Sequence, residues 1–485
     1  MLIWLLLIPV IAAACIGLLR TPGKVTALTS ATLTLILGLI ALLTDCGDPC
    51  PDSCFQLTLG LPLSSIMVLL TIIVTFAAIV GLKAPNKDAE RSWSISALLL
   101  SAGALGAFMS DNIIAFYGFH ELALIPTFIM IGCYGRGDRR SIAWRATIYL
   151  GVASMVLLAG LLLLCTEMNV YTFSALTAAV MNGVMPQHPC LIAGLLLAGF
   201  GTLVSLFPFH SWAAPAYASA PTPIAMLHAG VLKKFGLYGL FTIALAFGGN
   251  CGQLFGGWNN LLLLLLLGNV LWVGYVTIAQ TRLDDMLGNS SVMHMGYIFL
   301  AFAAFIAADG NNILALKGAG MLMLAHGLTI ALLFLLCGQI ESSTKTLELD
   351  SMGGLARKLP LLGFFFGLAG MASIGLPLLA NFVGEFTIFV SCFHGWTPAP
   401  VQCDCILGSI ANLFGGLGAV QLTLIFALWG LVISAIYMLR AFRNIFEASV
   451  GHASERAVRL CCSDVMAAAF LAFFIVLFGI MPNLF

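Results

Sequence analysis

Residues 223–246 read PIAMLHAGVLKKFGLYGLFTIALA. A bilayer-spanning helix needs about 20 mainly apolar residues, so this stretch is long enough to cross a membrane. It nevertheless contains His228, Lys233 and Lys234. A charged side chain at the bilayer centre costs about 2.5–3.5 kcal/mol even on lenient insertion scales, and it needs a partner, a hydrated cavity or a function. The stretch therefore predicts a membrane helix that contains functional polar groups inside the bilayer.

The composition of the whole chain indicates that its solvent is lipid. Of 485 residues, 61% are hydrophobic and 8% are charged, and the mean hydropathy is +1.07. That leaves too little polar surface to cover a water-soluble globule. We predict an all-α polytopic membrane protein with about fourteen transmembrane helices, in the runs 2–19, 27–44, 61–82, 93–109, 112–133, 142–165, 190–208, 223–246, 260–280, 290–308, 313–340, 360–393, 419–440 and 463–482. The first run has no basic residue before it and no small-residue cleavage site, which favours a retained helix.

The basic residues predict the orientation, because Lys and Arg in short loops stay on the cytoplasmic side. Outside the apolar runs they occur only in or beside odd-numbered loops, so both termini are expected on the outer side of a bacterial inner membrane. The net charge is zero, which gives no indication of a nucleic-acid partner. The residues in question are Arg20, Lys24, Lys83, Lys87, Arg91, Arg136, Arg139, Arg140, Arg145, Arg282, Lys345, Arg357, Lys358, Arg440, Arg443, Arg456 and Arg459.

Two prolines interrupt the predicted helices at matching places. Pro208 falls in the seventh run and Pro377 in the twelfth, where each removes a backbone hydrogen bond. A proline kink is common in one helix, but paired interruptions in two halves of a transporter indicate inverted repeats with sites between them. We predict two inverted five-helix repeats with broken helices 7 and 12. The expected divisions are helices 1–3 in 1–92, the first repeat in 93–246, the second repeat in 260–446 and helix 14 in 447–485.

Titratable residues recur within the apolar runs. Such groups persist either as structural pairs in a packed bundle or as a proton relay. Desolvation disfavours the charged forms of acids and amines, which brings both closer to exchanging protons near neutral pH. The recurrence of acid, amine and imidazole on neighbouring helices favours the relay. Its candidates are Glu121, Lys234, His294, His326 and Glu385, with His120, His228 and Lys233 as secondary members and Lys317 near the start of helix 11.

Seven of the fourteen cysteines lie in or next to predicted outward loops, where an oxidising compartment permits disulfides. A bridge between the second and twelfth loops is expected to be possible, and a metal site in the second loop is the weaker alternative, because a second ligand pair is lacking. These cysteines are Cys46, Cys50, Cys54, Cys190, Cys251, Cys403 and Cys405.

Several motifs resemble a known family, the antiporter-like subunits of respiratory complex I and of Mrp antiporters. The resemblance covers residues from about 95 to 445 and includes the stretch quoted above. The motifs are FHSW (209–212), APTP (220–223), LHAGVLKK (227–234), YG (238–239), QT (280–281), SSVMHMG (290–296), AHGL (325–328), LLCGQ (335–339), MGGL (352–355) and NFVGEF (381–386).

The resemblance implies specific roles for the titratable residues. Glu121 is similar to the family's helix 5 glutamate, Lys234 to its central helix 8 lysine, and His294 and His326 to histidines that pass protons toward helix 12. Glu385 is typical of the chain-4-like subunits, whereas the chain-2-like and chain-5-like subunits have lysine there. These paralogues and the lipid bilayer are the implied partners. NADH, FMN, iron-sulfur clusters and quinone are expected in partner subunits, with no cofactor in this chain.

Three positions depart from the family pattern. Leu203 stands where the family has the helix 7 lysine, Asp284 and Asp285 replace a basic pair, and residues 213–215 (AAP) replace Leu-Pro-Asp. The departures keep two alternatives to a proton-pumping NADH-quinone oxidoreductase subunit open. One is an Mrp-type cation/proton antiporter or membrane-bound hydrogenase subunit, and the other is a structural paralogue that does not pump.

Overall fold

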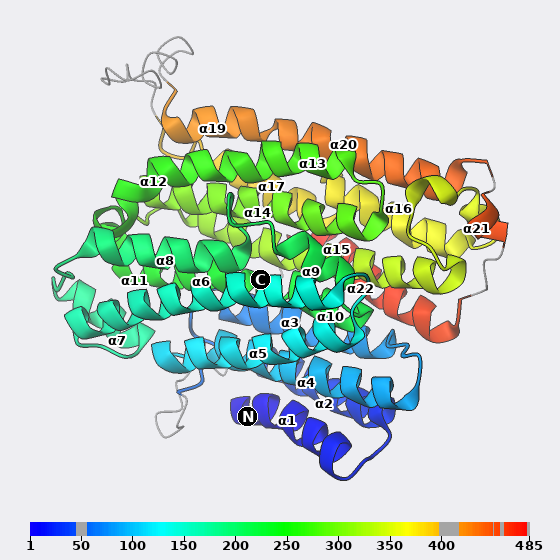
Figure 1. The fold of residues 1–485 in the computed structure, drawn as a ribbon. Helices are drawn as coiled ribbons and strands as arrows, with labels where there is room; N and C mark the ends of the chain where they lie inside the picture. The colour runs from blue at the N-terminus through cyan, green and yellow to red at the C-terminus, as the bar shows by residue number, and fades with distance from the viewer. Residues whose placement is uncertain (45–55, 397–416, 450, 456–459, 483–485) are drawn as a thin grey trace.

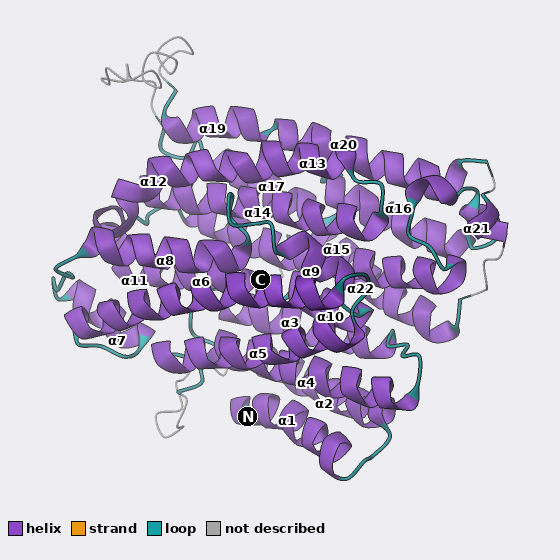
Figure 2. Cartoon of the chain, viewed as in Figure 1, coloured by secondary structure: helices purple, strands orange, loops and turns teal. Residues whose placement is uncertain are grey.

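The computed structural model describes residues 1–44, 56–396, 417–449, 451–455 and 460–482, and within these ranges the chain is helical with no strand (Figures 1 and 2). Three isolated bridges are its only extended pairings there. The first half contains α1 (Leu2–Leu18), α2 (Gly23–Leu43), α3 (Ser64–Val80), α4 (Lys87–Met109), α5 (Ile113–Tyr134), α6 (Arg139–Met168), α7 (Phe173–Met181), α8 (Pro189–Val204), α9 (Ala213–Ser219), α10 (Thr222–Gly230), η1 (Leu232–Lys234), α11 (Phe235–Phe247) and η2 (Gly248–Asn250). The second contains α12 (Cys251–Leu267), η3 (Gly268–Val273), α13 (Gly274–Ala279), α14 (Leu283–Ala307), α15 (Ile313–Thr344), η4 (Leu349–Ser351), η5 (Leu355–Arg357), α16 (Pro360–Ile374), α17 (Ala380–Ser391), α19 (Ala419–Ala427), α20 (Trp429–Phe442), η6 (Arg443–Glu447), α21 (His452–Glu455) and α22 (Cys462–Ile480).

The helices follow the predicted apolar runs, which confirms the all-α fold. In the described residues, nine helical stretches are long and apolar enough to cross a membrane, and one of them, Thr222–Ala279, joins two predicted runs. Four shorter apolar helices, α1, α3, α8 and α16, match further runs. The number of crossings and the bounds of the repeats stay predictions.

The odd-numbered loops gather at one end of the bundle, at the right in Figure 1 near α21. Ion pairs and hydrogen bonds join loops that are far apart in the sequence, so the described basic residues that make them lie at this end of the molecule. The contacts are Lys24 Nζ to the Leu82 carbonyl at 2.8 Å, Arg136 to Glu341 at 2.5 Å, Arg282 to Glu348 at 3.4 Å, Arg440 to the Gln280 carbonyl at 2.6 Å, and the Lys83–Asp464 pair.

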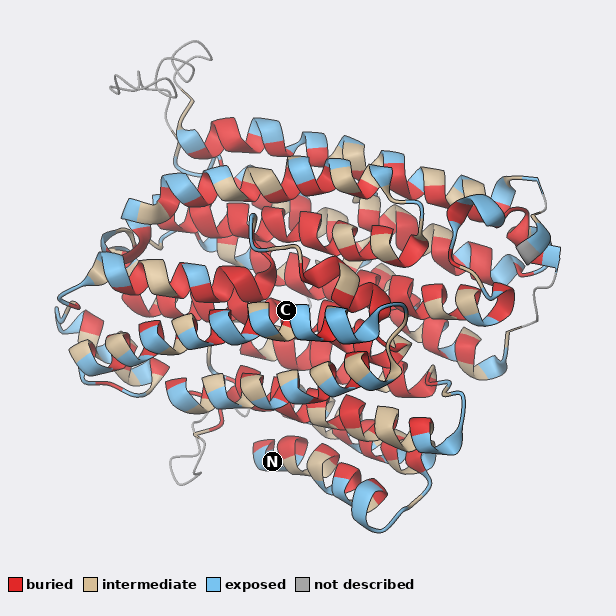
Figure 3. Ribbon diagram, viewed as in Figure 1, coloured by how far each residue is buried: buried red, intermediate tan, exposed pale blue. Residues whose placement is uncertain are grey.

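Burial separates a central layer from an outer one (Figure 3). Nearly every residue in the apolar segments of α14 and α15 is buried. In α2, α5, α6 and α22, less than half of the residues in the apolar segment are buried. The outer helices expose large apolar side chains such as Ile125, Ile148 and Met155. Lipid tails are the natural neighbours of such side chains, and the central layer is where a polar site is shielded from them.

The two predicted helix breaks have the same local geometry. α8 is capped by Ser205 with φ +70°, and α16 is capped by Gly375 with φ +83°. At both positions the cap amide bonds three residues back and the next amide bonds five residues back. This left-handed cap satisfies the last carbonyls of each half-helix, and Pro208 and Pro377 follow shortly after it. The likeness supports the predicted pairing of helices 7 and 12.

Asn269, in the π-helical turn η3, holds the first break in place. Its buried side chain accepts a hydrogen bond from the Phe207 amide at 2.7 Å and donates to the Ser205 carbonyl at 2.9 Å. The Trp212 indole donates to the Thr202 carbonyl at 3.1 Å. Irregular backbone at membrane depth needs such protein partners, because water does not reach it there.

Helix 8 contains a third interruption, which the sequence analysis did not predict. At Val231 (φ −115°, ψ −64°) α10 gives way to the 3₁₀ turn η1, which holds both lysines. Gly230 lies against Gly327 of α15 so closely that a Cβ on Gly327 would meet the Gly230 carbonyl oxygen at 2.7 Å. Two glycines thus bring the interrupted helix and α15 into backbone contact.

Candidate proton-transfer site

The two lysines of η1 point to different partners. Lys233 Nζ lies 3.5 Å from Ser291 Oγ of α14 and 5.2 Å from the centre of the Tyr217 ring. Lys234 Nζ donates to the backbone carbonyl of Ala229 at 2.7 Å. Both side chains are buried. Lys234 is the predicted central lysine, but in this structure it is Lys233 that contacts the side chains leading to the histidines.

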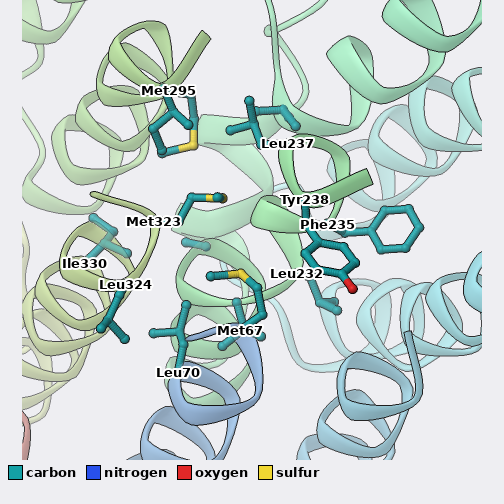
Figure 4. Close-up of a cluster of buried hydrophobic side chains, with 14 of the residues drawn as sticks. Met67, Leu70, Leu232, Phe235, Leu237, Tyr238, Met295, Met323, Leu324 and Ile330 are labelled. Carbon is teal, nitrogen blue, oxygen red and sulfur yellow. The ribbon is translucent and has the colours of Figure 1, made fainter. Parts of the chain in front are cut away.

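An apolar cluster surrounds the lysine turn (Figure 4). Leu232 and Phe235, the residues on either side of the two lysines, belong to it, together with Met67 of α3 and Met323 of α15. Because these neighbours offer no charge to the amines, the few polar atoms within reach determine where a proton can go.

The two predicted histidines lie together between α14 and α15. His326 Nε2 is 3.2 Å from Ser291 Oγ, and its ring stacks on that of His294 with centroids 5.3 Å apart and planes 13° apart. Lys233, Ser291, His326 and His294 therefore form a connected row, buried at every position.

His294 faces two carbonyl oxygens. Nδ1 is 2.8 Å from the Ser290 carbonyl and Nε2 is 2.9 Å from the Ser373 carbonyl at the end of α16. A neutral imidazole has one N–H and can satisfy only one of them, whereas an imidazolium satisfies both. Glu385 Oε1, 4.0 Å from Nε2, has no hydrogen-bond partner within the described part of the chain. The geometry thus suits a proton on His294 opposite the Glu385 carboxylate.

Gly375 provides the space for Glu385. The carboxylate lies against the Gly375 Cα, where a methyl group would overlap Oε2. Gly375 also adopts φ +83°, a left-handed conformation that side chains disfavour. The helix break and the position of the acid therefore depend on one glycine.

Glu121 forms a second polar group toward the side of the bundle. It accepts a hydrogen bond from Ser154 of α6 at 2.5 Å, and Tyr117 lies 2.7 Å from the same hydroxyl. His120 Nδ1 is 3.4 Å from its carboxylate. About one third of the Glu121 side chain is exposed. It lines a cavity of about 190 Å³ between α5 and α6 that reaches inward to His228.

His228 lies between the two groups. Its ring packs edge-on against the Tyr217 ring, with centroids 5.2 Å apart. Lys233 Nζ lies over the same tyrosine ring. His228 Nδ1 is buried and, within the described ranges, has no hydrogen-bond partner. His120 instead stacks on Phe235, 3.9 Å between centroids. The structure brings Lys233, both central histidines and Glu385 into one row. Within the described residues, a cavity leads from Glu121 to His228, and His228 contacts the same tyrosine as Lys233.

The remaining positions singled out by the sequence lie outside this row. Leu203 is buried and apolar. Lys317 is exposed near the start of α15. Asp284 is buried and pairs with Arg282 at 2.8 Å, at the basic end of the bundle. Cys190 and Cys251 carry free thiols. The predicted bridge or metal site involving Cys46, Cys50, Cys54, Cys403 and Cys405 lies outside the described residues.

Sequence reasoning missed the hydroxyl groups. Ser291 stands between Lys233 and His326, and Ser154 holds Glu121. The paired serines of SSVMHMG were a weak signal, because a helical serine can also bond the carbonyl one turn back in its own helix. Only the coordinates show that Ser290 Oγ faces Tyr437, at 2.7 Å, whereas Ser291 faces the row.

Polar cavities open at both ends of the bundle. The cavity at the basic end has a volume of about 600 Å³, and the one at the opposite end about 570 Å³. The first is lined by groups that include Lys83, Arg136, Glu341, Lys345 and Asp464, and the second by groups that include Asn259, Asn312, Ser391, His394 and Gln421.

The fold and the buried row define a polytopic membrane protein of the antiporter-like class. The family profile described as NADH:quinone oxidoreductase/Mrp antiporter, TM, matches residues 110–410. This match spans more than half of the chain, so the chain belongs to that family.

Individual relatives agree. NADH-quinone oxidoreductase subunit M of Rickettsia prowazekii is 27% identical over 417 residues, which are 86% of this chain and 78% of that protein. NAD(P)H-quinone oxidoreductase chain 4-2 of Synechocystis sp. is 31% identical over 349 residues, 72% of this chain and 58% of that protein. These matches confirm the sequence-based assignment to subunit M and chain 4 relatives.

Solved structures share the fold. A chain of respiratory complex I from Thermus thermophilus with bound NADH aligns with a TM-score of 0.84 and 23% identity, covering 100% of this chain and 96% of that one. A chain of the Mrp complex from Dietzia sp. aligns with a TM-score of 0.80 and 17% identity, covering 100% and 94%.

Proposed function

We propose that this chain is a proton-translocating membrane-arm subunit of a complex I-type NADH-quinone oxidoreductase. The observation that carries the proposal is the buried row from Lys233 through Ser291, His326 and His294 to Glu385. Buried amines, imidazoles and acids in contact change charge together, because each charge is costly alone and is stabilised by the next. A row of this kind holds and moves protons.

In the proposed mechanism, a charge change in a neighbouring subunit alters which group of the row is protonated. A proton leaves an amine of η1, passes to the histidine pair, and reaches Glu385 across the 4.0 Å separation from His294. Quinone reduction elsewhere in the complex supplies the energy. NADH, FMN, iron-sulfur clusters and quinone are assigned to partner subunits, and chain-2-like and chain-5-like subunits are the proposed membrane neighbours.

The polar cavities at the two ends supply and receive the protons. We place the basic end on the cytoplasmic side by the positive-inside rule, with both termini outside and the chain in a bacterial inner membrane. The cavity at Arg136 and Asp464 then takes up protons, and the cavity at Asn312 and Ser391 releases them after Glu385, which lies on the same helix as Ser391.

The test is the Glu385→Gln variant in the assembled complex, in inverted membrane vesicles. We expect fewer protons moved per NADH oxidised, measured with an acridine dye against quinone reduction in the same vesicles. Glu348→Gln is the control, because Glu348 is a half-exposed surface carboxylate outside the row. An unchanged proton-to-NADH ratio in an intact complex would refute the proposal.

One observation favours the alternative of a structural subunit that does not pump. Among the described residues, the polar contacts of the Glu121 carboxylate are the Ser154 hydroxyl and His120, with no lysine or arginine, and the helix 7 position is Leu203. Glu121→Gln separates the two functions. Lower pumping places Glu121 in the path, whereas wild-type pumping in both glutamate variants would favour the structural role.

A further inference from the structure

We infer that Lys233 and Ser291 are proton-carrying residues, and that together they link helix 8 to the histidine pair. The inference rests on the proposed function and deepens it, because it adds a hydroxyl to the path and selects Lys233 over Lys234 as the lysine that feeds the histidines.

Lys233 is the amine whose acceptor can pass a proton on. Its Nζ lies 3.5 Å from Ser291 Oγ and over the Tyr217 ring, which also stabilises a cation. Lys234 donates to the Ala229 carbonyl, which accepts a hydrogen bond but has no proton of its own to give. Among the described residues, Lys233 is thus the buried lysine of η1 with a hydrogen-bond contact to a group that both accepts and donates.

Ser291 is positioned to do both. Its hydroxyl lies 3.2 Å from His326 Nε2 on one side and 3.5 Å from Lys233 Nζ on the other. The neighbouring Ser290 hydroxyl is engaged by the Tyr437 hydroxyl, at 2.7 Å. One helix thus presents two adjacent hydroxyls in different directions, and one of them bridges an amine and an imidazole.

The transfer step is balanced. An N–H bond of the Lys233 ammonium breaks as an O–H bond forms on Ser291, while the original O–H bond of Ser291 breaks and an N–H bond forms at His326 Nε2. Lys233 becomes a neutral amine, the Ser291 hydroxyl is regenerated, and His326 becomes an imidazolium. No electrons are exchanged and no other reactant is required.

The geometry also makes Lys233 a gate. A separation of 3.5 Å exceeds the usual 2.7–3.2 Å of an N–H···O hydrogen bond, so Lys233 must approach Ser291 by at least about 0.3 Å before the transfer. Lys233 lies in the 3₁₀ turn between α10 and α11, where the backbone hydrogen bonds of helix 8 are interrupted.

The experiment compares Ser291→Ala, Ser291→Thr and Glu385→Gln in the assembled complex in inverted vesicles. We expect Ser291→Ala to lower the proton-to-NADH ratio to the level of Glu385→Gln, and Ser291→Thr, which keeps the hydroxyl, to restore it. Ser434→Ala is the matched control, because Ser434 is a buried serine of α20 that bonds to the Leu431 carbonyl outside the row.

Lys233→Gln provides a second test that does not depend on the serine. The amide can still hydrogen-bond to Ser291, but it does not ionise and so delivers no proton, and we therefore expect the same reduced ratio. The double variant with Ser291→Ala should be no worse than either single variant, since both act on one path. If Ser291→Ala fails to assemble, the Lys233→Gln result decides.

The outcomes separate the two proposals. A wild-type ratio in Ser291→Ala or in Lys233→Gln, beside a reduced ratio in Glu385→Gln, overturns the link and leaves the proposed function intact. A wild-type ratio in Glu385→Gln itself overturns the proposed function.

Discussion

Replacing Asn269 by leucine should destabilise the chain through the break in helix 7. Its side chain bonds the Phe207 amide at 2.7 Å, the Ser205 carbonyl at 2.9 Å and the Val292 carbonyl at 3.1 Å. Leucine has a similar size but bonds to none of them. A buried polar group that loses its partner costs about 1–3 kcal/mol. The Val292 carbonyl lies within α14, where the helix supplies another donor, so the main losses fall on the two groups of the break and sum to about 2–6 kcal/mol.

The assay heats the detergent-solubilised complex and follows the fraction of this chain that stays soluble, by immunoblot. We expect the Asn269→Leu midpoint to fall by several degrees and assembly to decrease. Asn260→Leu is the control, because Asn260 is exposed on the helix that precedes the same turn. Equal midpoints for the wild type and Asn269→Leu would show that the break does not depend on this side chain, and would refute the reasoning.

Two further predictions concern a glycine and an ion pair. Gly375→Ala should lower the free energy of unfolding by about 1–2 kcal/mol, because alanine disfavours the left-handed backbone conformation. It should also displace Glu385, so we expect pumping per assembled complex to fall as well. Gly137→Ala, with φ +64° and open space around it, isolates the backbone cost, and equal pumping in the two variants would contradict the claim. Asp464→Asn should lower the free energy of unfolding by about 1–2 kcal/mol. This value lies between those for exposed and buried ion pairs, because Asp464 is buried while its partner Lys83 is partly exposed. An unchanged thermal midpoint of the complex would exclude that contribution.

Much of the fold could be predicted because lipid imposes strict rules on a sequence. Apolar runs of bilayer length must be helical, since each backbone group needs a partner within its own segment. Pro208 and Pro377 marked two interruptions for the same reason. The interruption at Val231 could not be predicted, because no proline marks it and adjacent lysines do not by themselves break a helix. It coincides with the backbone contact between Gly230 and Gly327, which are far apart in the sequence.

The sequence indicated some of the polar residues that lie together, but not how they are connected. Glu385, His294 and His326 stand out because polar groups are rare in apolar runs, and the structure places all three in one row. Which lysine of the adjacent pair faces them depends on the rotation of a 3₁₀ turn, which residue spacing does not determine. Serines are common in membrane helices, so Ser291 becomes notable only through its two neighbours in space.

The hydrogen bonds of His294 couple its charge to the mechanics of the helix end. Through Nε2 the ring contacts the Ser373 carbonyl in the last turn of α16, and through Nδ1 it contacts the Ser290 carbonyl of its own helix, α14. A neutral ring has one N–H, so one of these two contacts then lacks its donor. When the proton leaves Nε2, the imidazole no longer bonds to the half-helix next to Glu385, and a local chemical event removes a contact between two membrane segments.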